Sequence, residues 1–118
     1  MSSGAIFNAR VWLTAWVLGA CGPSFPPAYV ASRTAAEHAY ERGDYRHAAS
    51  LWADAARKAP PGREREEANY RRAVSLERAG DDSAADALYR SLESSPGERS
   101  ERAAYARAEI AERHVAKT

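Results

Sequence analysis

Residues 43–60 decide the fold of this chain and read GDYRHAASLWADAARKAP. Small and aromatic side chains recur in this stretch at intervals of three and four residues, at Tyr45, Ala48, Trp52, Ala55 and Ala59. That spacing predicts one apolar stripe along a helix over 45–59. Gly43 suits the left-handed position that follows a helix, and Pro60 prevents the next helix from continuing.

Similar helix-breaking residues divide the rest of the chain on both sides of this stretch. Helix breakers occur at Gly43-Asp44, Pro60-Pro61-Gly62, Gly80-Asp81-Asp82 and Pro96-Gly97. Helix formers dominate between them, and β-branched residues are too rare for strands. The sequence therefore predicts an all-α domain over 28–118, with helices near 28–42, 45–59, 63–79, 83–94 and 98–116. Asp44 and Asp82 are expected to cap the helices that follow them.

Each expected helix needs an apolar stripe to pack against its neighbours. In the fourth helix we expect Ala85, Leu88, Tyr89 and Leu92, and in the fifth Ala104, Ala108, Ala111 and Val115. Because most stripe residues are alanines, the helices must approach closely, with Trp52, Leu76 and Leu88 filling the gaps. The charges of the last helix, including Arg107 and Arg113, are expected on its solvated face.

The sequence also contains an internal repeat. Gly43 and Gly80 lie 37 residues apart, and ANYRRA at 68–73 matches AAYARA at 103–108 with a shift of 35. A period near 34 is typical of tetratricopeptide repeats, which the chain resembles from about residue 30 to 116. The resemblance implies antiparallel helical hairpins, about two repeats plus a C-terminal capping helix. Ala36 and Ala73 occupy the small positions where each first helix packs on its second.

The second unit departs from the family, because Asp82 replaces the turn aromatic and Pro96 comes one position early. Ser32 and Ala35 replace the Trp and Leu that the family has early in the first unit. In that family the first helix of each hairpin lines a concave groove for peptides. Carried over by position, the groove residues are Arg33, Glu37, Tyr40, Tyr70, Val74, Glu77, Tyr105 and Glu109. The alternative is that Tyr70 and Tyr105 pack against a neighbouring hairpin with only their hydroxyls exposed. The groove charges are mixed, so we expect no specificity for a carboxylate tail.

The first twenty residues have the order of a secretory signal. Arg10 precedes the apolar run VWLTAWVL at 11–18, and the small residues Gly19 and Ala20 follow it. The run is too short to span a bilayer, which takes about 20 apolar residues. We therefore expect a signal peptide over 1–20 and a proline-rich tether over 21–27.

The tetrapeptide Leu18-Gly19-Ala20-Cys21 resembles the lipobox of bacterial lipoproteins. That resemblance implies cleavage before Cys21 and a diacylglycerol joined to its sulfur, with further acylation of the new N-terminus. Two or more acyl chains give stable membrane attachment. The alternative is a free or buried thiol behind an uncut leader. Gly22, rather than Asp, follows the cysteine, which favours the outer over the inner membrane, with the domain on the periplasmic side.

Charge and side-chain chemistry narrow the function. The chain has 17 basic and 16 acidic residues, which argues against nucleic-acid binding. His38, His47 and His114 lack ligand spacing, and Asp81-Asp82 fits a turn. We expect no enzyme, no metal, no cofactor beyond the lipid and no small-molecule substrate. The prediction is an envelope scaffold or assembly factor that binds a protein partner. Alternatives are a self-assembling structural subunit, or an accessory lipoprotein that binds peptidoglycan or another envelope ligand.

Overall fold

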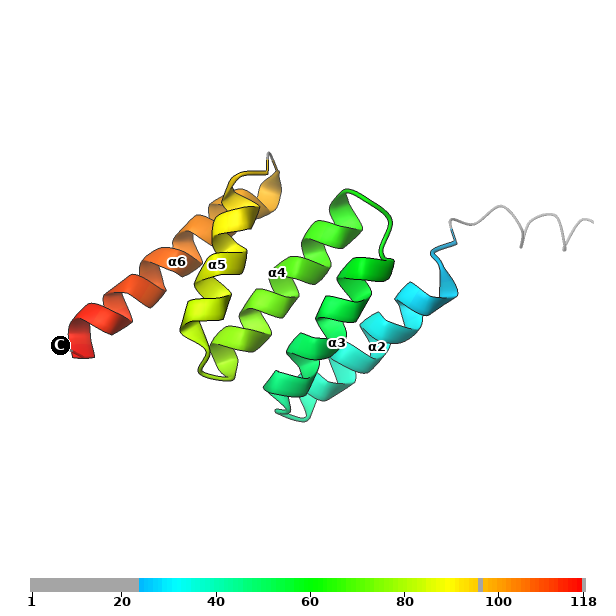
Figure 1. The fold of residues 1–118 in the computed structure, drawn as a ribbon, viewed down its shortest axis with the longest axis horizontal. Coiled ribbons are helices and arrows are strands. Elements are labelled where there is room, and N and C mark those ends of the chain that lie inside the picture. The colour runs from blue at the N-terminus through cyan, green and yellow to red at the C-terminus, as the bar shows by residue number, and fades with distance from the viewer. Residues whose placement is uncertain (1–23, 96, 118) are drawn as a thin grey trace, which may run out of the picture.

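The computed structural model describes residues 24–95 and 97–117. All regular secondary structure in this part of the chain is α-helix. Its helices are α2 (Pro27–Glu41), α3 (Tyr45–Lys58), α4 (Arg63–Arg78), α5 (Asp82–Glu93) and α6 (Glu98–Lys117). They follow one another in a single row of antiparallel hairpins (Figure 1). The predicted all-α fold of stacked hairpins is confirmed, and each helix end lies within one residue of its expected position. The leader and Cys21 lie outside the described residues, as do tether residues 22 and 23.

The turns between the helices confirm the predicted role of the glycines but not that of the aspartates. Gly43 and Gly80 have φ of 81° and 89°, the left-handed conformation that glycine adopts without a Cβ clash. The cap prediction is wrong in detail. Asp44 makes no side-chain cap, and Asp81 rather than Asp82 accepts the N–H of Ala84, at 3.2 Å. Asp82 is already the first residue of α5.

Two apolar clusters form the core. The N-terminal cluster joins α2, α3 and the start of α4, and consists of Tyr29, Ala36, Ala39, Ala48, Trp52, Ala55, Ala56, Ala59 and Ala68. The C-terminal cluster joins α4, α5 and α6, and consists of Ala73, Ala85, Tyr89, Leu92, Ala103, Ala106 and Ile110. Because α4 contributes Ala68 to one cluster and Ala73 to the other, it connects the two halves of the stack.

Close helix approach at small residues is confirmed. Ala36 and Ala73 are both 0% exposed, as their predicted places at the hairpin contacts require. Trp52 fills the gap in the N-terminal cluster and is 2% exposed. Leu76 and Leu88 are only partly buried, so the large side chain at the centre of the C-terminal cluster is Tyr89.

The predicted stripe of α6 is wrong. Its members Ala104, Ala108, Ala111 and Val115 are all exposed, while Ala103, Ala106 and Ile110 are buried. The 35-residue shift explains the error. Ala103 is equivalent to Ala68, which faces the preceding hairpin, whereas Ala108 is equivalent to Ala73, which α5 covers. Within the described chain no helix covers α6 in that way.

The charges of α6 are also placed differently from the prediction. Arg107 and Arg113 do not point away from the protein but form ion pairs with α5 and α4. A small apolar stripe leaves room for long side chains to lie beside it, so these arginines border the contact instead of the solvent-facing side. No helix within 24–95 and 97–117 combines the length and apolarity needed to cross a bilayer.

Candidate functional site

A continuous groove runs along the first helices of the hairpins. It consists of three adjoining hollows with volumes of about 420, 330 and 210 Å³. The first lies between α4 and α6, the second between α2, α3 and α4, and the third near the start of α2. The first and second share Tyr70, Val74 and Arg102 in their walls. The second and third share Trp52 and Glu67, so the hollows form one surface feature.

The structure places every predicted groove residue in the wall of this groove. The first hollow contains Tyr70, Val74, Glu77, Tyr105 and Glu109. The second adds Glu37 and Tyr40, and the third adds Arg33. They come together because α2, α4 and α6 present corresponding faces from successive hairpins. Their role in binding stays a prediction.

The two equivalent tyrosines differ in exposure. Tyr105 is 69% exposed, so the alternative in which it packs against a neighbouring hairpin is wrong for this residue. Tyr70 is half-buried, and its ring centroid lies 5.9 Å from that of Tyr89 at an angle of 59°. The groove therefore has one half-buried tyrosine, packed on Tyr89, and one tyrosine that is exposed.

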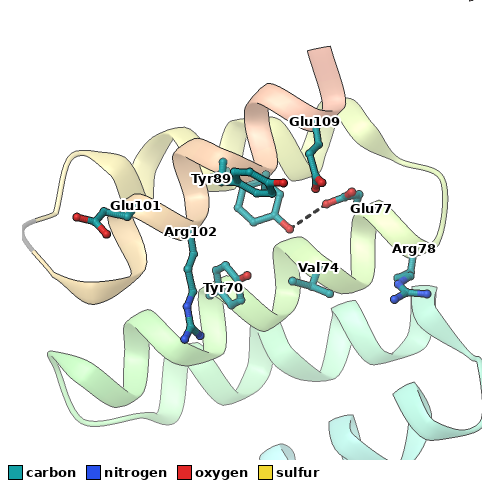
Figure 2. Close-up of a pocket in the computed structure, with 10 residues that line it drawn as sticks. Tyr70, Val74, Glu77, Arg78, Tyr89, Glu101, Arg102 and Glu109 are labelled. Atoms are coloured by element: carbon teal, nitrogen blue, oxygen red, sulfur yellow. Dashed lines mark hydrogen bonds between the residues drawn. The ribbon is translucent and has the colours of Figure 1, made fainter. Parts of the chain in front are cut away.

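Sequence reasoning missed several residues of the groove. Tyr89 was assigned to the core, which is correct, yet its hydroxyl reaches the first hollow and donates to Glu77 Oε1 at 3.0 Å (Figure 2). Burial, followed by the charge and hydrogen bond of Glu77, raises the pKa of Tyr89, so the phenol stays a neutral donor. The one feature of the sequence that could have indicated this is the length of the side chain, because a tyrosine in the buried stripe of a helix can extend its hydroxyl to the surface.

Arginines supply the other unpredicted contacts. Arg102 extends from α6 toward α4 and borders the first two hollows (Figure 2). The guanidinium of Arg71 lies 5.5 Å from the ring centroid of Trp52, in cation–π range. Arg102 is one of the charges expected on the solvated face of the last helix, and the sequence predicts no role for Arg71. Together they place two guanidinium groups beside the aromatic rings of the groove.

Much of the groove charge is neutralised within the protein. Arg33 Nε donates to Glu37 Oε1 at 3.2 Å, and Arg71 Nε donates to Glu67 Oε1 at 2.9 Å. Burial opposes ionisation of Glu67, but the hydrogen bonds from Arg71 and Arg99 outweigh it and lower its pKa. A lining of paired charges around tyrosines favours contact through aromatic and mixed polar groups over attraction to one strongly charged ligand.

Within residues 24–95 and 97–117, no three histidine, cysteine or carboxylate side chains are grouped to hold a metal ion. The described site brings aromatic rings and hydrogen-bond donors together along one surface. No protein-family model matches the chain, nor does any curated protein or solved structure.

Proposed function

We propose that the protein is a membrane-anchored scaffold or assembly factor of the bacterial cell envelope that grips a protein partner in the groove. The continuous groove, lined by residues from three successive first helices, carries this proposal. Tyr105, exposed beside Tyr70 and Val74, supplies the kind of aromatic contact that dominates binding energy at protein interfaces. The resemblance to tetratricopeptide repeats supports the same conclusion, because that family binds peptides on the same helices.

The anchor in this proposal is a lipid on Cys21. The lipobox-like tetrapeptide and the apolar leader support it. Because α2 begins at Pro27, the tether is residues 21–26, which reach at most about 22 Å and would hold the groove close to the membrane surface. Anchoring of this kind raises the local concentration of the scaffold for any partner in the same membrane.

The groove is tested by chemical crosslinking in cells, followed by purification of the tagged protein. The double variant Tyr70→Ala, Tyr105→Ala is expected to lose a crosslinked partner that the unaltered protein retains. Val30→Ala is the matched control, because Val30 is 43% exposed on α2 and lines none of the three hollows. Identical partners in all three samples would contradict binding through the groove.

The anchor is tested by the intact mass of the protein extracted from membranes. The expected mass is that of residues 21–118 plus a diacylglyceryl group, with or without a third acyl chain. Cys21→Ser is expected to keep the leader and to lack the added lipid mass. Recovery of the unmodified 118-residue chain from the cytosol would contradict the proposal.

Self-association is a second candidate, favoured by one observation. Ala104, Ala108 and Ala111 form an exposed small-residue face on α6. A second helix packs closely only where side chains are this small. Sedimentation equilibrium distinguishes the two candidates, because a self-assembling subunit gains mass with concentration, and Ala108→Glu would abolish that gain.

A further inference from the structure

The helix that forms one wall of the groove is held differently from the others. Across residues 24–95 and 97–117, every ion pair that joins two helices includes a side chain of α6, whereas the other pairs lie within single helices. We call Arg99, Arg107 and Arg113 the arginine clasp. This difference sets α6 apart from α2–α5.

The clasp grips α5 through Arg107. Its Nε donates to Asp86 Oδ1 at 2.9 Å, and its Nη1 donates to Glu93 Oε2 at 2.7 Å. These hydrogen bonds raise the pKa of Arg107, which therefore stays charged. The side chains of Arg107 and both acids remain about 30% exposed, so salt ions reach the pairs.

The two ends of the clasp hold α6 to α4. Arg99 pairs with Glu67 near the start of α6. At the other end, Arg113 Nη2 donates to Glu77 Oε2 at 2.9 Å and lies 3.4 Å from Asp82 Oδ1 of α5. Glu77 also accepts the Tyr89 hydroxyl, so the clasp and the groove share a carboxylate.

The apolar part of the attachment of α6 depends mainly on one large side chain. The buried side chains of α6 are Ala103, Ala106 and Ile110, of which only Ile110 is large. Since the hydrophobic contribution scales with the area removed from water, two alanines supply a small share of it. Partly exposed ion pairs are individually weak and are screened by salt.

We propose that α6 is a salt-sensitive, detachable wall of the groove. It leaves the stack as one unit while α2–α5 stay folded, and the open form becomes more populated as ionic strength rises. Weakly attached elements of folded proteins commonly open in such contiguous units. The proposal stands on the clasp and on burial, and it is independent of what the groove binds.

Opening would dismantle the largest hollow of the groove. Arg102 and Glu109 would leave with α6 (Figure 2), as would Tyr105. The α6-facing side of Tyr89 and Leu92 would be uncovered. The groove would thus be assembled at low ionic strength and partly taken apart at high ionic strength. Any ligand that contacts both α4 and α6 would hold the wall closed, because it binds only the closed form.

Hydrogen exchange of the full chain, followed by mass spectrometry, tests this proposal. Exchange is compared at about 20 mM and about 500 mM NaCl, which shortens the range of electrostatic interactions several-fold. Peptides from α6 are expected to exchange about 3- to 10-fold faster at high salt, given the small free energy of partly exposed pairs. Peptides from α3 serve as the internal reference and should keep their exchange rate.

A matched pair of variants separates the clasp from general charge effects. Arg107→Gln removes both pairs to α5 and should accelerate exchange of α6 about 3- to 10-fold at low salt while reducing its salt dependence. Arg57→Gln removes the same charge from a pair within α3 and should leave α6 unchanged. Equal exchange of α6 and α3 at both salt concentrations, or equal effects of the two variants, would overturn the proposal.

Discussion

Both ends of this helical stack have alanine-rich helix contacts, but different interactions hold the two ends together. At the N-terminal end, Trp52 and Tyr29 are almost fully buried among the alanines of α2 and α3. At the C-terminal end, Ile110 and two alanines of α6 are buried, and the arginine clasp surrounds them. At both ends the alanine stripe determines how closely the helices approach. The larger or charged residues beside the stripe determine how strongly the helices are attached.

The difference has physical consequences, because the two forces respond to different conditions. Burial of a tryptophan is insensitive to salt and to mild acid. Partly exposed ion pairs weaken in salt and disappear when their carboxylates are protonated. The N-terminal hairpin is therefore the durable part of the molecule, and the α6 wall of the groove is its adjustable part.

The comparison is tested most strongly at Trp52. Trp52→Ala is expected to lower the free energy of unfolding by about 3 to 5 kcal/mol, because it leaves a cavity in the N-terminal cluster. Urea denaturation followed by circular dichroism measures the loss, which should be the same at low and high salt. Val30→Ala on the exposed side of α2 is the control and should change the value by less than about 0.5 kcal/mol. A loss for Trp52→Ala as small as the control would contradict the assigned role of Trp52.

Ile110 provides the corresponding test at the other end. Ile110→Ala is expected to cost about 2 to 3 kcal/mol, since Ile110 is 5% exposed and is the one large apolar anchor of α6. The effect should be local, so hydrogen exchange should accelerate in α6 while α3 retains its protection. If α3 lost protection to the same extent, the two ends would be one cooperative unit and the comparison would fail.

The hydroxyl of Tyr89 joins the C-terminal cluster to the clasp and allows a finer test. Tyr89→Phe keeps the ring but removes the hydrogen bond to Glu77, and should cost about 0.5 to 1.5 kcal/mol in urea denaturation. Tyr45→Phe is a control in the N-terminal half, where the ring packs edge-on against Tyr40. A zero effect at Tyr89 would show that the hydroxyl does not couple the groove floor to the clasp.

The smallest expected effect is a pH dependence carried by Glu67. Its pKa is lowered from the ordinary 4.5 by Arg71 and Arg99, so the folded state binds its proton less readily than the unfolded state does. The stabilisation is fully present above about pH 4.5 and is lost as the pH falls through the lower, folded-state pKa. Thermal midpoints measured between about pH 6 and pH 3 should fall less steeply in Glu67→Gln than in the unaltered protein. Parallel profiles would remove Glu67 from the acid-sensitive part of the clasp.

Helix boundaries follow from local features, whereas groove membership is predicted from the resemblance to tetratricopeptide repeats. Gly43 and Gly80 adopt the left-handed conformation that terminates a helix. Pro60 forces the preceding residue, Ala59, into extended backbone with ψ of 148°. The register of Tyr70 and Tyr105, set by the 35-residue shift, placed both in one groove. The helix ends depend on neighbouring residues in the sequence, and the equivalence of the two tyrosines depends on the internal repeat.

The sequence alone therefore determined the all-α class and the hairpins, and its resemblance to tetratricopeptide repeats indicated the face that lines the groove. The tertiary structure decided which side of α6 meets α5, the inward role of Arg107 and Arg113, and the different exposure of Tyr70 and Tyr105. The reason is that α6 has small apolar residues on two sides, with Ala103 and Ala106 on one and Ala104 and Ala108 on the other, and helical periodicity alone does not distinguish them. Only the positions of Ile110, Asp86 and Glu77 in space distinguish them, because arginine pairing depends on residues that are distant in sequence.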